Sequence, residues 1–288
     1  MSESSSTDHV LKDIVEPVNR YFHVPVSARI VSWLCQTRAT PNQVSYTSIL
    51  LGILSGLAFM SGGHFGMFWG GVLLELSLIL DCVDGQLARA TGQSSEWGRL
   101  LDGIGGYVAY LAVVFGITYS LPEFTGALAV VTVVCIMKAI CFDYCKQYFT
   151  ARVQEGTDGS RADVLKTYQK WSQSQSGILK VYFYYLQLQQ WVFHGRWSSI
   201  NDYSLEDERK ASEEILTQEE RNAFYLKTRP LTRIWRWNGH EFCLFLLAAF
   251  SLFDLLPMLL TPLAVVMTVQ FFLTLALHRM LLPNEIRP

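Results

Sequence analysis

The sequence predicts an all-α integral membrane protein with six transmembrane helices, an N-terminal amphipathic surface helix, and a cytosolic helical insert between helices four and five. The chain has 288 residues, of which 50% are hydrophobic and 17% are charged, and its mean hydropathy is +0.22. No Asp, Glu, Lys or Arg occurs in residues 39–74, 103–122, 242–253 or 255–277. Because a bilayer core takes about 20 apolar residues per helix, these tracts suit spans joined by short turns.

The first 37 residues predict a tail followed by a juxtamembrane helix. Residues 1–10 are polar, so we expect them to be disordered. They lack the basic segment and the apolar run of a cleaved signal peptide. Apolar residues then recur at roughly helical spacing, as at Ile14, Val18, Phe22 and Trp33. A helix with this pattern is expected to lie on the membrane surface.

Residues 38–149 hold the first four expected spans, and residues 238–288 hold the last two and the C-terminal tail. Thr40 followed by Pro41 is a helix-start signal at the head of the first span. The expected spans cover residues 43–60, 66–88, 98–120, 124–149, 238–256 and 262–282.

The placement of basic residues predicts the orientation of these spans. With the N-terminus in the cytoplasm, the outside turns are residues 61–65, 120–123 and 255–261, and none contains Lys or Arg. Basic residues favour the cytoplasmic side, so we expect both termini and the end of the second span to face the cytoplasm. The net charge of −2 and the lack of a basic, aromatic patch argue against nucleic acid as a partner.

Residues 150–237 form the predicted insert. We expect an aromatic amphipathic helix from Gly177 to Phe193 and a charged helix from Ser204 to Lys227. The six cysteines form no C-x-x-C pair, so we interpret them as small hydrophobic residues, not as disulfides or a zinc site. His240 and Glu241 begin the fifth span, where a helix-end pair is favoured over a metal site.

Carboxylates, an arginine and small residues gather at the end of the second span and the start of the third. They are Asp81, Asp84, Gly85, Ala88, Arg89, Gly98 and Asp102. Members three or four residues apart share a helix face, and the nine residues from Arg89 to Trp97 can turn the two faces toward each other. Converging carboxylates repel unless a cation neutralises them, and oxygen-only ligands favour Mg²⁺ or Mn²⁺.

The other members of this group suit a phosphorylated ligand. Glycines let a flat base or a phosphate approach the backbone, and Arg89 offers a fork of donors to phosphate. The alternative is a buried ion-pair network at a helix junction. Ionisable residues at membrane segments point to function by default. Seven fixed positions, each with a frequency of roughly 5–8%, also seldom coincide by chance.

The pattern D-x2-D-G-x2-A-R-x8-G-x3-D resembles the signature of the CDP-alcohol phosphotransferase family, and the resemblance covers roughly residues 38–150. It implies a six-helix membrane homodimer that transfers a substituted phosphate from a CDP-linked donor to a lipid or polar alcohol acceptor. CMP is released, and the product belongs to phospholipid or related lipid biosynthesis. By resemblance, Asp81, Asp84 and Asp102 bind one or two divalent metals. The resemblance assigns the donor nucleotide and its phosphates to Asn42, Gly85, Ala88, Arg89 and Gly98.

The sequence departs from this signature at Gly106, where the family normally has a fourth aspartate. That aspartate completes the metal site and takes the proton of the acceptor. Either the base comes from elsewhere, or the acceptor is itself acidic and needs no strong base, with the space at Gly106 left to it. A catalytically silent nucleotide- or lipid-binding relative is the third explanation. A transporter is less favoured, because we find neither the paired repeats nor the broken helices that transporters often show.

Four further residues are candidates for a role in the reaction. Asp143 is the candidate substitute base, and Lys138, Arg229 and Arg233 are candidates for binding an acceptor phosphate. Alternatively, Asp143 and Lys138 pair with each other or with Glu75, and the arginines are positive charges at a lipid surface.

Overall fold

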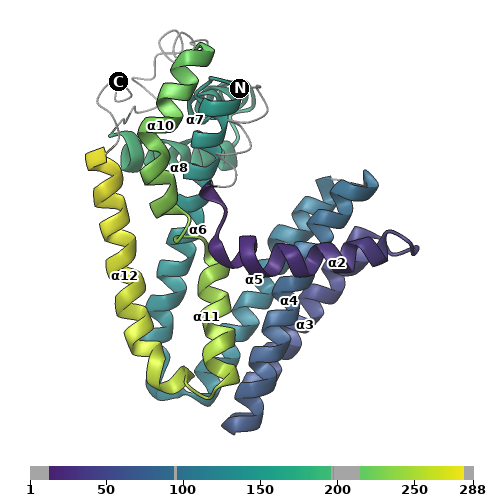
Figure 1. Cartoon of the computed structure of the whole chain (residues 1–288). Coiled ribbons are helices and arrows are strands. Elements are labelled where there is room, and N and C mark those ends of the chain that lie inside the picture. The colour runs from purple at the N-terminus through teal and green to yellow at the C-terminus, as the bar shows by residue number, and fades with distance from the viewer. Residues whose placement is uncertain (1–12, 94–95, 196, 198–214, 282–288) are drawn as a thin grey trace. The chain divides into compact units, whose positions relative to one another are not determined.

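The computed structural model describes residues 13–93, 96–195, 197 and 215–281, with the backbone alone at residues 96, 97, 99, 100, 102, 103 and 178. Every regular element in these ranges is helical (Figure 1). The elements are η1 (Asn19–His23), α2 (Val24–Leu34), α3 (Pro41–Met60), α4 (Gly63–Thr91), α5 (Glu96–Ser120), η2 (Pro122–Phe124), α6 (Thr125–Gln154), α7 (Gly159–Ser174), α8 (Gly177–His194), α10 (Gln218–Trp235), α11 (His240–Leu252) and α12 (Leu256–Leu281).

Four stretches are long and apolar enough to cross a membrane: α3, α4, the residues Pro122–Gln154 that include α6, and α12. A shorter apolar stretch, Ile104–Ser120, makes up most of α5, and α11 has 13 residues. The all-α class is therefore confirmed, with four candidate spans among the described residues. The spans expected at α5 and α11 stay predictions.

The chain folds as two compact units. The motif unit holds the described residues of 16–136 and 240–269. The insert unit holds those of 13–15, 137–239 and 270–281. Helices α6 and α12 each contribute residues to both units.

Within the motif unit, α3 packs against both α4 and α5, and α11 packs against α4. Ser48 and Ser77 tie α3 to α4, because each hydroxyl donates to the other residue's carbonyl at 2.8 Å. Helices α3 and α5 touch main chain to main chain: a Cβ at Gly56 would meet the carbonyl of Ala112, and a Cβ at Gly116 would meet the carbonyl of Gly56. Small residues permit such close approach between membrane helices.

The N-terminal helix packs across α4 in the motif unit (Figure 1). It buries Val31 in an apolar cluster with residues of α3 and α4, namely Val44, Ile79, Val83 and Leu87. Tyr21 and Trp33 lie on the exposed side, with 70% and 64% of their surface accessible. One face of this segment is thus packed and the other carries exposed aromatic side chains. Its location on the membrane surface stays a prediction.

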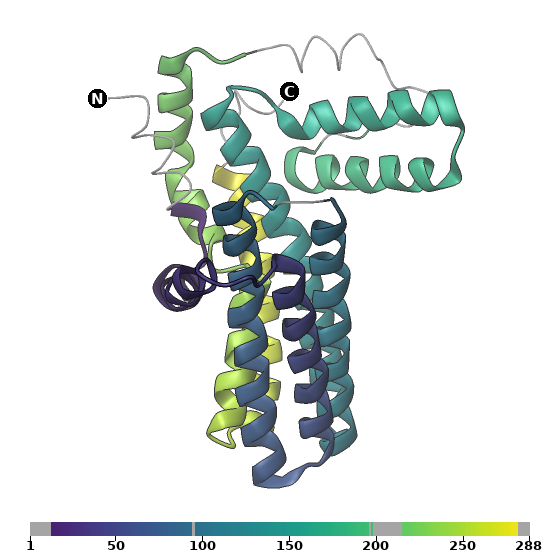
Figure 2. The ribbon, with the colours of Figure 1, turned by 90° about the vertical axis from the view of Figure 1, so that its right-hand side faces the viewer.

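In the insert unit, α7 and α8 run side by side (Figure 2). Val164 from α7 packs with Phe183 and Leu186 from α8. Helix α8 confirms the helix expected from Gly177 to Phe193, whereas α7 was not expected.

The charged helix expected from Ser204 starts later in the described chain. Residues 204–214 lie outside the description, residues 215–217 are not helical, and α10 begins at Gln218. Thr217 caps it, because its side chain accepts from the amide of Glu220 while the Glu220 carboxylate accepts from the amide of Thr217. This reciprocal cap sets the start of the helix.

The turn between the last two helices also differs from the expected one. Helix α11 ends at Leu252 and α12 begins at Leu256, so Pro262, expected as the first residue of the sixth span, lies inside α12. Pro257 occupies the first turn of α12, where its missing N–H leaves no helical hydrogen bond unmade. Asp254 makes the turn with φ 56°, a conformation that Asp adopts more readily than most residues.

Candidate functional site

The last three turns of α4 carry most of the motif. Asp84 and Gly85 lie three and four residues after Asp81, and Ala88 lies four and three residues after them, so all four line one face of the helix. Asp84 is 5% exposed. The helix ends at Thr91, and Gly92 takes the left-handed conformation with φ 67° that commonly follows a helix.

A serine on the neighbouring helix holds Asp84 in place. The hydroxyl of buried Ser45 donates to Oδ2 of Asp84 at 2.5 Å. Ser45 lies three residues after the half-buried Asn42 on the first turns of α3. Thr40 caps this helix end, as its start signal predicted. Ser45 was not among the residues expected at the site, although its i+3 spacing from Asn42 was a usable signal.

The arginine of the motif folds back over its glycine. A Cβ built on Gly85 would lie 3.5 Å from Nη1 and 3.9 Å from Nη2 of Arg89. Arg89 itself is exposed. The guanidinium therefore lies beside Gly85, the residue that follows Asp84, where the lack of a side chain leaves the backbone exposed.

Helix α5 carries the second half of the motif. Gly98, Asp102 and Gly106 are four residues apart, which places them on one face. The backbone of Asp102 is described, and its side chain lies outside the described part. Gly106 is exposed, and a Cβ there would meet nothing within 4 Å. Helices α4 and α5 both pack against α3 and touch each other only slightly, so α3 holds the two halves of the motif in one unit.

A model of the CDP-alcohol phosphatidyltransferase family matches residues 38–196, which is more than half of the chain. This chain belongs to that family. The resemblance read from Asp81 to Asp102 is thereby confirmed.

Individual relatives match shorter stretches of this chain. A bifunctional IPC transferase and DIPP synthase from Thermococcus kodakarensis is 38% identical over 101 residues, which are 33% of this chain and 22% of the relative. A phosphatidylinositol phosphate synthase from Streptomyces avermitilis is 27% identical over 144 residues, 49% of this chain and 58% of the relative. An archaetidylinositol phosphate synthase from Pyrococcus horikoshii is 33% identical over 89 residues, 31% of this chain and 46% of the relative. The chain thus covers less than two thirds of each.

The candidate base, Asp143, and the candidate lysine, Lys138, lie on α6, in the insert unit. Lys138 is 2% exposed, and its Nζ donates to Oε1 of Gln270 at 2.6 Å. Asp143 is exposed. Glu75 accepts from His23 at 2.8 Å within the motif unit. Lys138 and Glu75 thus bond to Gln270 and His23, whereas the sequence suggested that Lys138 and Asp143 pair with each other or with Glu75. The roles of Asp143 and Lys138 stay predictions.

The two candidate arginines on α10 share one carboxylate. Asp13 accepts from Nε of Arg229 at 2.7 Å and from Nε of Arg233 at 3.1 Å. The Tyr225 hydroxyl donates to it at 2.8 Å. Burial opposes ionisation of Asp13, but these three hydrogen bonds prevail and hold its pKa below the usual 3.8. Asp13 was not among the residues expected from the sequence. Because its carboxylate pairs with both arginines, part of their positive charge is already balanced within the insert unit.

Proposed function

We propose that the chain transfers a substituted phosphate from a CDP-linked donor to an alcohol or phosphate-bearing acceptor, with release of CMP. Its place would be phospholipid or related lipid biosynthesis. One observation carries the proposal: the motif from Asp81 to Asp102 occupies two packed helices of a chain that belongs to this family. Ser45 supports it by fixing the Asp84 carboxylate.

The residues present fit a divalent metal. Asp81 and Asp84 offer carboxylate oxygens from one helix face, and Asp102 is the third proposed ligand. Oxygen donors suit Mg²⁺ or Mn²⁺, and a hydroxyl bonded to a ligating carboxylate is the usual way to orient it. When bound, the metal neutralises the diphosphate and stabilises the leaving group.

The chain's own residues would bind the donor around that position. Gly85, Ala88 and Gly98 keep side-chain bulk low on the faces of α4 and α5 where the cytidine would lie. The Arg89 guanidinium, already beside Gly85, would donate to the donor phosphates. Asn42, at the start of α3, is the remaining proposed nucleotide contact.

The acceptor side follows from Gly106, which offers no base. We propose that its open space belongs to the acceptor and that either Asp143 takes the proton or the acceptor is acidic enough to need no strong base. Lys138, Arg229 and Arg233 are the proposed acceptor contacts. Two relatives are named as synthases of phosphatidylinositol phosphate and archaetidylinositol phosphate, so an inositol phosphate is the first acceptor to test.

The membrane arrangement is part of the same proposal. We propose six spans, with the motif and both termini in the cytoplasm, and a homodimeric assembly in lipid. The four candidate spans among the described residues support a location in the membrane, and the absence of basic residues from the outside turns supports the orientation.

The deciding experiment measures CMP release by the full chain in lipid with Mg²⁺ or Mn²⁺. CDP-diacylglycerol, CDP-choline and CDP-ethanolamine are each offered with inositol phosphate and with a mixed pool of alcohols. Asp81→Ala should abolish release. The matched carboxylate control, Asp254→Asn, should retain it, because Asp254 lies in the turn after α11 and Asn tolerates its positive φ.

Gly106 also favours a second candidate, a silent relative that binds nucleotide without turnover. Metal-dependent CDP binding that needs Asp81, with no CMP from any donor, would establish this candidate and reject the transferase.

A further inference from the structure

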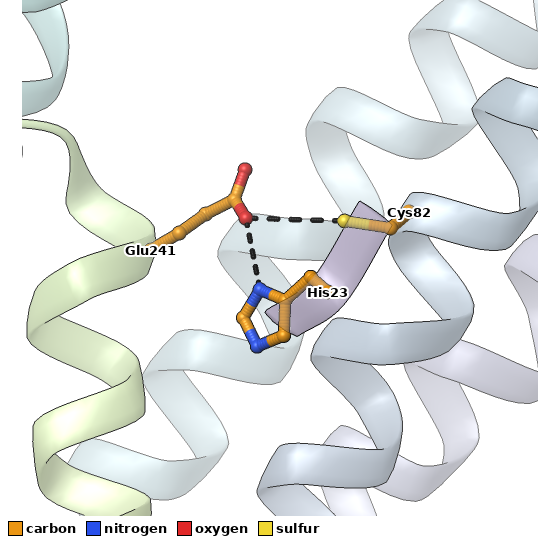
Figure 3. Close-up of side chains that lie close together, drawn as sticks. All are labelled: His23, Cys82 and Glu241. Carbon is orange, nitrogen blue, oxygen red and sulfur yellow. Dashed lines mark hydrogen bonds and ion pairs between the residues drawn. The ribbon is translucent and has the colours of Figure 1, made fainter. Parts of the chain in front are cut away.

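A second cluster of ligand-type side chains lies in the motif unit, on residues that the proposed reaction does not use. It joins three elements, with His23 from η1, Cys82 from α4 and Glu241 from α11 (Figure 3). Their donor atoms lie within 4.8 Å of one another. His23 is fully buried. Nitrogen, sulfur and oxygen donors from chain positions far apart thus meet at one point.

The separations suit a small tetrahedral cation. His23 Nδ1 lies 3.3 Å from Glu241 Oε2, and Cys82 Sγ lies 3.9 Å from the same oxygen. The Asn19 amide oxygen lies 2.9 Å from His23 Nδ1 and 3.9 Å from Cys82 Sγ. Zinc bonds of about 2.0–2.3 Å at tetrahedral angles place neighbouring donors roughly 3.3–3.8 Å apart. Only small side-chain shifts separate the observed positions from such a shell.

The other nitrogen of the ring provides an independent observation. His23 Nε2 lies 2.8 Å from Oε1 of Glu75, a carboxylate of α4 that is not part of the motif. Histidines that bind metal almost always donate their second N–H to a carboxylate or carbonyl in this way. The rings of Phe22 and Phe245 lie against the imidazole at centroid distances of 5.5 Å and 6.2 Å. They give the cluster an apolar shell.

The cluster is rich in negative charge. The carboxylates of Glu241 and Glu75 lie against the two ring nitrogens of His23, at 3.3 Å from Nδ1 and 2.8 Å from Nε2. A divalent cation bound to Nδ1 and to the Cys82 sulfur would displace the thiol proton and any proton on Nδ1, and these protons would pass to solvent.

We infer that His23 Nδ1, Cys82 Sγ and Glu241 Oε2 bind a thiophilic divalent cation of the zinc class, with Asn19 or water as the fourth ligand and Glu75 orienting the ring. A thiolate and an imidazole select such a metal, whereas the oxygen-only motif favours magnesium. The cation would fasten the N-terminal helix to α4 and α11. Glu16 already ties that segment to α11, because its carboxylate accepts from the amide of Phe242 at 3.0 Å.

The test is cobalt binding to the full chain in lipid after chelator treatment. One Co²⁺ per chain should give the near-ultraviolet charge-transfer band of a thiolate ligand, whatever further Co²⁺ binds to the motif carboxylates. Cys82→Ser should remove the band. Glu75→Gln should keep the band but weaken binding about 10–100-fold, as loss of an orienting partner does. Thermal unfolding of each variant without metal checks that it folds.

Two matched controls separate this site from the rest of the chain. Cys35→Ser removes an exposed cysteine just after α2 and should leave the band unchanged. Asp84→Asn disables the motif and should also leave it unchanged. The inference is overturned if wild type shows no thiolate band, if the band survives Cys82→Ser, or if Asp84→Asn removes it. None of these readouts depends on transferase activity.

Discussion

The hydrogen bond from Ser45 to Asp84 links a residue outside the motif to the proposed metal site. Ser45→Ala removes that donor from the carboxylate, so the orientation of Asp84 toward the proposed metal would be lost. We expect a loss of about 10–100-fold in kcat/KM or in metal affinity. Steady-state CMP release as a function of Mn²⁺ concentration measures both.

Ser55→Ala is the matched control for this change. Ser55 is also buried on α3, and it donates to the carbonyl of Gly70 at 2.7 Å, away from the motif. An equal loss of activity in both variants would mean that packing of α3, and not the orientation of Asp84, accounts for the effect.

Gly106 permits a test of where the acceptor lies. A Cβ fits there without contact, so Gly106→Asp should fold normally. The added charge should raise the KM for a phosphate-bearing acceptor by about tenfold or more, because like charges brought together cost several kcal/mol. Gly106→Asn controls for size. If the aspartate variant instead gains activity, the missing base limits the native reaction.

At the level of elements, the contact between α3 and α5 depends on bare backbone. Gly116→Ala places a methyl against the carbonyl of Gly56, and overpacking of this kind destabilises by about 1–3 kcal/mol. Gly126→Ala, where nothing lies within 4 Å of the new Cβ, should stabilise α6 by up to about 1 kcal/mol. Denaturant unfolding of the two variants should give free-energy changes of opposite sign; equal signs would contradict this packing.

The carboxylate of Asp13 ties the start of the described chain to α10. Asp13→Asn weakens two charged hydrogen bonds to half-exposed arginines, so we expect a loss of about 1–2 kcal/mol at pH 7. Because the folded pKa of Asp13 is lowered, its stabilisation is present above pH 3.8 and is lost as the pH falls through the lowered value.

Thermal unfolding at pH 7 and near pH 3 measures this difference. The gap between wild type and Asp13→Asn should shrink at the lower pH. Asp163→Asn, which changes an exposed carboxylate on α7, should show little effect at either pH. A gap that does not change with pH would assign the loss to packing.

Local signals explain which elements could be predicted. Thr40 and Pro41 mark the start of α3, and the expected second and third spans fall within α4 and α5. Helix α7 escaped prediction because its mixed polar sequence has no marked apolar period; Asp158 caps it through a side chain that accepts from the amide of Arg161. For α10, the sequence contains the capping box formed by Thr217 and Glu220. The expected helix start was instead placed at Ser204, earlier in the chain.

For the whole molecule, charge-free tracts were enough to predict an all-helical membrane protein, and seven motif positions were enough to predict its family. The contacts between residues far apart in the chain could not be predicted from the sequence. Cys82 and Glu241 are 159 residues apart and Asp13 and Arg229 are 216 apart. Each cysteine or acid alone fits a plainer role, and only packing shows which of them share a partner.

The vacant space over Gly106 has a pharmacological consequence. A substrate analogue with an added substituent aimed at this position meets open volume in this chain, but it would meet a carboxylate in proteins with the complete signature. If the proposed transfer holds, such an analogue would be a substrate or an inhibitor selective for this chain in a membrane that also holds its relatives.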